Sequence, residues 1–135
     1  MSTDNSPHDT MAFADVLREM DIDFIVLGEY GITVEDAAKL IHKDHFIFLD
    51  VRTREEREHL AFPFAMHIPI DELPDRLGEL PRDKFIITFC LTGFRGVMAY
   101  AFLRTQGFDE VKALKGRLDN LAGAMTPRRF YRLRP

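Results

Sequence analysis

The chain has little of three features that would each point to a class of protein. It has one cysteine in 135 residues, so no internal disulfide can form, and a lone thiol is typical of a reducing compartment. It has no basic excess: its formal net charge is −4, whereas nucleic-acid-binding domains usually carry a strong positive balance. Its longest apolar stretch, 61–70, contains Pro63 and His67. That stretch is too short for a membrane span, which takes roughly 18 apolar residues.

The remaining composition is that of an ordinary soluble domain. The hydrophobic fraction is 46% and the charged fraction is 30%. Residues 1–10 are polar, and no basic segment leads from them into an apolar run, so we expect no export signal and a cytoplasmic protein without membrane partners. A chain of this length can bury roughly 65–70% of its unfolded surface, so it needs no structural metal, and we expect no cofactor.

Helical patterns and short apolar strands alternate along the chain. Strands that are apolar on both faces and separated by helices indicate a parallel sheet covered on both sides. We therefore predict an α/β fold, with a central parallel sheet and helices on both faces. In such sheets, sites lie at the carboxyl ends of the strands. The strands are expected at 46–49, 65–68, 84–89 and 110–114, and the helices at 34–42, 53–60, 71–80, 96–106 and 116–125.

The alternation defines three parts of the chain. Residues 1–30 are predicted to be an N-terminal extension, partly disordered, with a short helix over 11–20 and an edge strand or tight connector at 24–27. Residues 31–125 are predicted to form the single domain. Residues 126–135 form a basic tail with four arginines, which could contact nucleic acid or an acidic protein. Its apolar residues favour packing on the domain with the arginines in water, so we expect no nucleic-acid partner.

The only cysteine stands directly after the clearest predicted strand. Residues 90–95 join that strand to the next predicted helix. Backbone N–H groups in such a short loop can converge on one point, and with the helix dipole they favour a negative charge. Gly93 permits a backbone conformation that a side chain would resist, and Arg95 adds a permanent positive charge with a forked donor.

This setting is expected to stabilise the thiolate of Cys90, which is the nucleophilic form, and to hold an anion above it. The alternative is that Cys90 is a small buried hydrophobe at a strand end. The residues that follow it, Thr92, Gly93 and Arg95, make little sense as core and favour the reactive thiol.

The loop resembles the active-site loop of the rhodanese family of sulfurtransferases, in which a cysteine opens a six-residue cradle, often with glycine fourth and arginine last. Three further segments resemble family signatures in the same order and spacing, over about residues 31–121. They are Phe48-Leu49-Asp50-Val51-Arg52 with Glu56 four residues later, His67-Ile68-Pro69-Ile70, and Gly107-Phe108-Asp109-Glu110-Val111 followed by Leu114-Lys115-Gly116.

The chain departs from the family pattern in two places. The Gly-His pair that often precedes the Ile-Pro strand is absent from residues 60–65, which puts local packing in question more than chemistry. Arg117 and Leu121 stand where a second glycine and a tryptophan are common, and the chain has no tryptophan at all.

The resemblance implies a ping-pong sulfurtransferase. Cys90 would take the sulfane sulfur of a thiosulfate-like donor as a persulfide and pass it to a thiophilic acceptor, a thiol or a protein. No second cysteine can resolve the persulfide, so the sulfur must leave to an outside acceptor. The resemblance implies Cys90 as the catalytic residue and, for donor binding, Arg95 with Leu91, Thr92, Gly93 and Phe94.

Two residues after the first predicted site strand have supporting roles. Arg52 is a further candidate for donor binding, and the alternative is a structural salt bridge to Asp50 or Glu56. Asp50 is expected to orient the loop or Arg95.

Three other functions stay open from the sequence. A non-catalytic sulfur carrier or regulatory interaction module would keep the same fold. A cysteine phosphatase or arsenate reductase usually has one more residue between cysteine and arginine and a histidine before the cysteine, where this chain has Phe89. A metal could bind near His42, Asp44 and His45, but no recognised ligand spacing is present, a solvated helix end explains them better, and we expect no metal.

Overall fold

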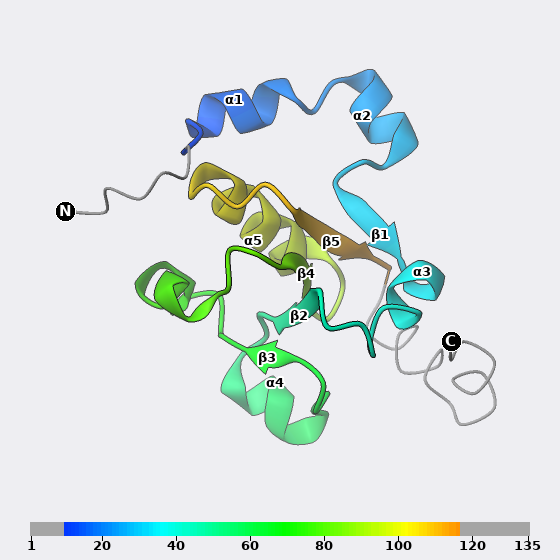
Figure 1. Ribbon diagram of the computed structural model, residues 1–135, viewed down its shortest axis with the longest axis vertical. Coiled ribbons are helices and arrows are strands. Elements are labelled where there is room, and N and C mark those ends of the chain that lie inside the picture. Colours follow the sequence, from blue (N-terminus) through cyan, green and yellow to red (C-terminus); the bar gives the residue numbers. More distant parts are fainter. Residues whose placement is uncertain (1–9, 117–135) are drawn as a thin grey trace.

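All five strands run parallel in one sheet. The computed structural model describes residues 10–116, and in it the strands lie in the order β1-β5-β4-β2-β3 (Figure 1). The strand that precedes the cysteine, β4, is therefore central. This confirms the predicted α/β fold with a parallel sheet. The strands are β1 (Gly31–Thr33), β2 (Phe46–Asp50), β3 (Met66–His67), β4 (Phe85–Phe89) and β5 (Val111–Lys115).

Helices lie on both faces of the sheet. Alternate residues of β4 and its end enter two apolar clusters: Ile86 and Cys90 pack with α1 and α5, whereas Ile87 and Phe89 pack with α3. Burial on both faces explains why β4 is apolar except for Thr88, whose buried hydroxyl donates to the Gly96 carbonyl. No helix within residues 10–116 is long and apolar enough to cross a membrane. The helices are α1 (Phe13–Arg18), α2 (Ile22–Leu27), α3 (Val34–Ala38), α4 (Arg54–His59) and α5 (Phe94–Thr105).

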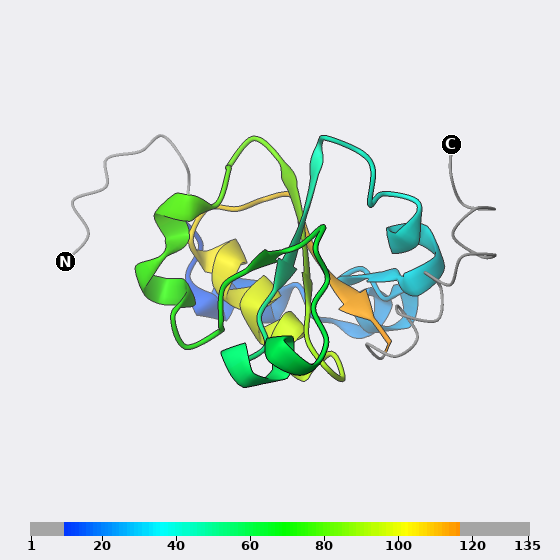
Figure 2. The ribbon, with the colours of Figure 1, turned by 90° about the horizontal axis from the view of Figure 1, so that it is seen from below.

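The carboxyl end of the sheet carries the predicted site. Figure 2 shows α4 and the loop before α5 at the same end of the sheet, and a side-chain pair between Glu56 and Arg95 joins them. A capping box begins α4: Thr53 accepts a hydrogen bond from the Glu56 N–H, and the Glu56 carboxylate accepts one from the Thr53 N–H. The helix predicted over 53–60 is thus confirmed as α4.

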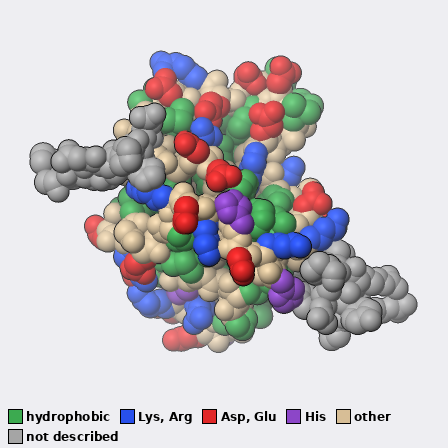
Figure 3. Space-filling view, viewed as in Figure 1, with side chains coloured by type: hydrophobic (Ala, Val, Ile, Leu, Met, Phe, Trp, Pro, Cys, Tyr) green, Lys and Arg blue, Asp and Glu red, His purple; other side chains and the backbone are tan. Residues whose placement is uncertain are grey.

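The prediction of an edge strand or connector at 24–27 is wrong, because these residues belong to helix α2. The Asp21 side chain accepts a hydrogen bond from the Phe24 N–H at 2.9 Å, and Gly28 ends the helix in the left-handed region with φ 63°. Caps at both ends therefore override a short apolar run. The outer side of α2 stays exposed, and apolar and acidic side chains lie together over it at the upper right of Figure 3.

The single helix predicted over 71–80 is also wrong. Two 3-10 turns, Leu73–Asp75 and Leu77–Glu79, replace it. Arg76, between the two turns, leaves the helical region with φ −124° and ψ 19°, and Gly78 weakens a helix interior, so the segment does not propagate as one α-helix.

Other boundaries shift by a few residues. The helix predicted over 34–42 ends at Ala38, and the one predicted over 96–106 begins at Phe94. The four predicted strands correspond to β2, β3, β4 and β5, and β1 is additional. The helix predicted over 116–125 and the basic tail 126–135 lie, apart from residue 116, outside the described residues.

The described part of the N-terminal extension packs mainly against helix α5. The predicted helix at 11–20 is α1, with Val16 buried, although Phe13 and Leu17, which helical spacing places on the same face, are largely exposed. Val16 and Phe24 belong to the same apolar cluster as Cys90. The boundaries of the three predicted parts stay a prediction.

Helix α5 approaches β4 closely at Gly96. A Cβ at this position would lie 3.3 Å from Phe89 Cα and 3.4 Å from Thr88 O. The Thr88 hydroxyl also donates a hydrogen bond of 2.6 Å to the Gly96 carbonyl. Because the neighbours are backbone atoms of the central strand, they cannot turn aside as a flexible side chain could.

We expect Gly96→Ala to lower the free energy of unfolding by about 1–3 kcal/mol, despite the better helix propensity of alanine. Gly78→Ala is the matched control, because a Cβ there has no atom within 4 Å. Chemical denaturation of both variants measures the effect. Equal stability of the two variants would contradict a close approach at Gly96.

Candidate active site

Cys90 lies at the carboxyl end of the central strand, under the first turn of α5. Its side chain is buried, with 2% of its surface exposed. The Gly96 N–H donates to Cys90 Sγ at 3.3 Å. The sulfur therefore sits at the N-terminal end of a 12-residue helix, where free backbone N–H groups and the helix dipole favour a negative charge.

The loop around Cys90 turns its other side chains outward. Gly93 has φ 101°, in the left-handed region that a residue with a Cβ resists, and it forms the N-cap of α5. Leu91, Thr92 and Phe94 are exposed. The loop thus presents the apolar side chains of Leu91 and Phe94 to solvent, while the backbone N–H that contacts the buried sulfur comes from Gly96, directly after the loop.

Arg95 is held beside the loop by Glu56. Its two terminal nitrogens donate to the two carboxylate oxygens at 2.6 and 2.8 Å. Hydrogen bonding to Arg95 lowers the pKa of Glu56 to about 2, against the opposing effect of burial. Hydrogen bonding to Glu56 raises the pKa of Arg95, burial opposes the rise, and the nearby Cys90 sulfur adds to it. The structure therefore brings Cys90, Arg95 and Glu56 together.

Glu56 is the residue that sequence reasoning placed least well. The sequence offered it as a partner of Arg52, yet its carboxylate pairs with Arg95, 39 residues away. The Thr53–Glu56 capping box was a readable local signal for the start of α4. The distant partner depends on the packing of α4 against the start of α5, which no local pattern encodes.

Arg52 forms a buried salt bridge with Asp50. Its Nε and one terminal nitrogen donate to the two Asp50 oxygens at 2.9 and 2.7 Å. The same terminal nitrogen donates to the Leu60 carbonyl at 2.6 Å, and the other donates to the Glu56 carbonyl at 3.4 Å. The salt bridge to Asp50 considered from the sequence is thus present. Donor binding by Arg52 stays a prediction. Asp50, expected to orient the loop or Arg95, pairs with Arg52 instead. The residue that holds Arg95 is Glu56.

Within residues 10–116, pockets lie at both ends of the sheet, and two of them bear on the site. One, of about 350 Å³, is partly walled by the loop residues Thr92, Gly93 and Phe94. The other, of about 500 Å³, is lined by the first residues of β4 and β5, Phe85 and Val111, so β4 separates it from Cys90.

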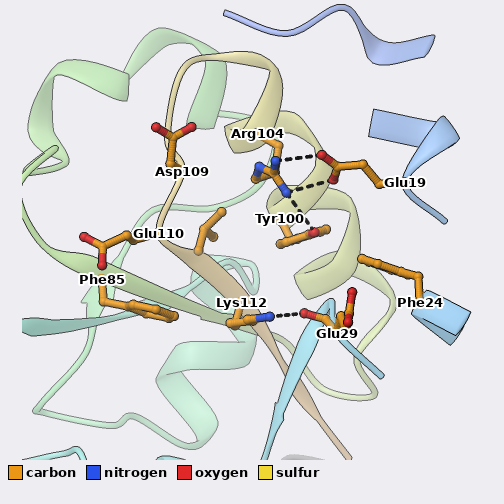
Figure 4. A pocket seen from close by; sticks show the side chains of 10 residues that line it. Glu19, Phe24, Glu29, Phe85, Tyr100, Arg104, Asp109, Glu110 and Lys112 are labelled. Atoms are coloured by element: carbon orange, nitrogen blue, oxygen red, sulfur yellow. Dashed lines mark hydrogen bonds and ion pairs between the residues drawn. The ribbon is translucent and has the colours of Figure 1, made fainter. Parts of the chain in front are cut away.

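The larger pocket already contains paired charges. Figure 4 shows Arg104 bound to Glu19, with both contacts at 2.9 Å, and Lys112 donating to the Glu29 carbonyl. Sites in parallel α/β sheets form at the carboxyl ends of the strands, which is the Cys90 end. The candidate active site is therefore the loop that holds Cys90.

The chain resembles known proteins over most of the described fold. It matches the model of the rhodanese-like domain over residues 33–124. A sulfurtransferase from Allochromatium vinosum is 31% identical over 78 residues, which are 58% of this chain and 73% of that protein. The chain spans 44% or less of the length of several other curated relatives.

Solved structures show the same fold. A protein from Lactobacillus plantarum superposes with a TM-score of 0.68 at 23% identity, over 82% of this chain and 97% of that one. A NAD-dependent persulfide reductase from A. fulgidus superposes with a TM-score of 0.55 at 36% identity, over 71% of this chain and 16% of that one. The relatives that carry the name sulfurtransferase, from Allochromatium vinosum and Bacillus subtilis, support sulfur transfer as the general chemistry. Because the family match covers more than half of the sequence, the chain belongs to the rhodanese-like domain family.

Proposed function

We propose that the protein is a sulfurtransferase that moves sulfane sulfur from a thiosulfate-like donor to a thiophilic acceptor through a persulfide on Cys90. The observation that carries the proposal is the placement of Cys90 Sγ, which accepts the Gly96 N–H at the start of α5. Backbone N–H groups at a helix N-terminus favour a negative charge, and the thiolate is the nucleophilic form of cysteine. The sulfurtransferase from Allochromatium vinosum supports the same general reaction.

In the first half-reaction, the Cys90 thiolate attacks the outer sulfur of thiosulfate. A bond forms between Sγ and that sulfur, the S–S bond of thiosulfate breaks, and its electron pair leaves with sulfite. Arg95 binds the oxyanion of the donor. A guanidinium has five N–H donors, so the two hydrogen bonds to Glu56 leave others for the donor.

In the second half-reaction, an outside thiol or cyanide attacks the outer sulfur of the Cys90 persulfide. The persulfide S–S bond breaks, and its electron pair returns to Sγ. The only cysteine in the sequence is Cys90, so the acceptor must come from another molecule. A protein that loads sulfur without releasing it at a useful rate would be the sulfur carrier or regulatory module instead.

The first prediction concerns sulfur loading. After incubation with thiosulfate, the intact mass of the wild type should increase by one sulfur atom, and cyanide should reverse the increase. Cys90→Ser should gain nothing, because a hydroxyl cannot form the persulfide, while its circular dichroism spectrum stays that of the wild type. Steady thiocyanate production from cyanide and thiosulfate separates the enzyme from a carrier. A wild-type chain with a free thiol that takes up no sulfur would contradict the proposal.

The second prediction concerns the donor site. Arg95→Ala should raise the KM for thiosulfate roughly 10–100-fold, because it removes a charge-assisted contact to the donor. Its effect on the free energy of unfolding should be smaller, about 1 kcal/mol. Arg54→Ala is the control: it also breaks an arginine–carboxylate pair, with Glu72, at a contact of 2.6 Å, but not one at the loop. An unchanged KM in Arg95→Ala would remove Arg95 from the donor site.

The third prediction concerns the Glu56–Arg95 pair. The folded-state pKa of Glu56 is about 2, below its ordinary value of 4.5, so the pair stabilises the fold above pH 4.5. Glu56→Gln keeps an oxygen for the helix cap but loses the charge, and it should cost about 1 kcal/mol at pH 7.

The difference in unfolding free energy between Glu56→Gln and the wild type should shrink as the pH falls from about 4.5 towards about 2, because in this range the Glu56 carboxylate of the unfolded wild type binds a proton while that of the folded state stays ionised. Urea denaturation at a series of pH values measures it. Glu58→Gln, on the exposed side of α4, should show no such dependence. A difference that stays constant down to pH 3 would show that Glu56 is not held by charge.

A further inference from the structure

The smaller pocket lies directly beside the proposed site. It has a volume of about 350 Å³. Three of its lining residues, 92–94, belong to the loop that holds Cys90. Its walls come from the loop, the first turns of α5 and the end of β5, including Thr92, Phe94, Val97, Met98, Leu114 and Lys115.

The chemistry of this pocket does not suit a thiosulfate-like donor. Its walls are mostly apolar, whereas thiosulfate is small and doubly charged. The groups proposed to bind thiosulfate are Arg95 and backbone N–H groups. Lys115 supplies the only charge among the lining residues, and within residues 10–116 no carboxylate pairs with it. The pocket therefore fits a molecule with an apolar group and a negative charge.

Apolar side chains of the pocket walls and of the loop are also exposed to solvent. Phe94 is 70% exposed, Met98 is 50% exposed and Leu91 is 46% exposed. The same helix buries Ala99 and Leu103 fully against the sheet, so the outward residues are not needed for its packing. Contiguous exposed apolar side chains at a site are typical of protein contacts. A small thiol would not cover them, but a peptide segment lying across the loop would.

We infer that the sulfur acceptor is a cysteine in an extended protein segment with a bulky apolar residue and a carboxylate close to that cysteine. The inference rests on the proposed function. The apolar side chain enters the pocket, and the carboxylate pairs with Lys115. The apolar residue is expected a few positions from the cysteine, because residues 92–94 of the loop that holds Cys90 also line the pocket.

The transfer step is an exchange between the acceptor thiol and the Cys90 persulfide. The acceptor thiolate attacks the outer sulfur of the Cys90 persulfide and forms the new S–S bond. The old S–S bond breaks, and its electron pair returns to Cys90 Sγ as the thiolate. Any proton on the outer sulfur travels with it to the acceptor persulfide.

Matched peptides test the inference on the full-length protein, loaded with sulfur from thiosulfate. The probe is acetyl-Gly-Cys-Gly-Phe-Glu-Gly-amide, and the two controls replace Phe by Ser or Glu by Gln. Intact mass against time gives the rate at which each peptide removes sulfur. The Phe-Glu peptide should be about tenfold faster than the Ser peptide, because it buries an aromatic side chain. The Gln peptide should fall between them.

Substitutions of pocket residues provide a second test of the inference. Met98→Gln and Lys115→Gln should each slow discharge by the Phe-Glu peptide several-fold and leave discharge by cyanide unchanged, because cyanide needs no pocket. Lys43→Gln, an exposed lysine elsewhere, is the control and should change neither. Lys115→Glu should reverse the preference, so that a Phe-Lys peptide becomes faster than the Phe-Glu peptide, which a merely structural lysine would not do.

The outcomes are distinguishable. Equal rates for all peptides, with normal discharge by cyanide, would overturn the inference and leave the proposed function standing. Discharge by 2-mercaptoethanol as fast as by the Phe-Glu peptide would assign a small-thiol acceptor and also overturn it. Failure of the wild type to load sulfur would overturn the proposed function and this inference together.

Discussion

The buried pair of Arg52 and Asp50 is the constraint on which the site end of the fold depends. Arg52 is 2% exposed, and a buried charge that loses its partner typically costs about 3–5 kcal/mol. Its donors are therefore committed to Asp50 at the end of β2, to the Leu60 carbonyl and to the Glu56 carbonyl. These contacts tie α4 and the chain that leaves it to the carboxyl end of the sheet, and so they fix where the Glu56 side chain can reach.

Two sets of contacts position the end of the cysteine loop, one from α4 and one from β4. Glu56 holds Arg95 through two short hydrogen bonds, and Gly96, the next residue, lies against β4 with its carbonyl accepting from Thr88. The N–H of Gly96 is then presented to Cys90 Sγ. The donors around the sulfur are thus set by the fold before any substrate binds, which is the arrangement that stabilises developing charge at least cost.

Features that depend on the local sequence pattern could be predicted. Features that depend on competing local signals, or on contacts between residues far apart in the sequence, could not. Apolar runs predicted β2 and β4, because a strand buried on both faces is apolar at most of its positions. The run at 24–27 has the same composition, yet the caps at Asp21 and Gly28 make it a helix. Cys90 and Arg95 could be predicted from their spacing within one loop. The Glu56–Arg95 pair could not, because it needs two helices that meet only in the folded chain.

The loop has two unlike sides, and this bears on how one cysteine could serve two half-reactions. On the side of α4, the ion pair of Arg95 and Glu56 offers charge and hydrogen bonds. On the side of β5, Phe94, Met98 and Leu114 offer apolar walls. A ping-pong carrier must accept an anion and then a different molecule at the same sulfur atom. Separate walls allow each to be selected by its own chemistry, and the loop needs to move little because both walls already adjoin it.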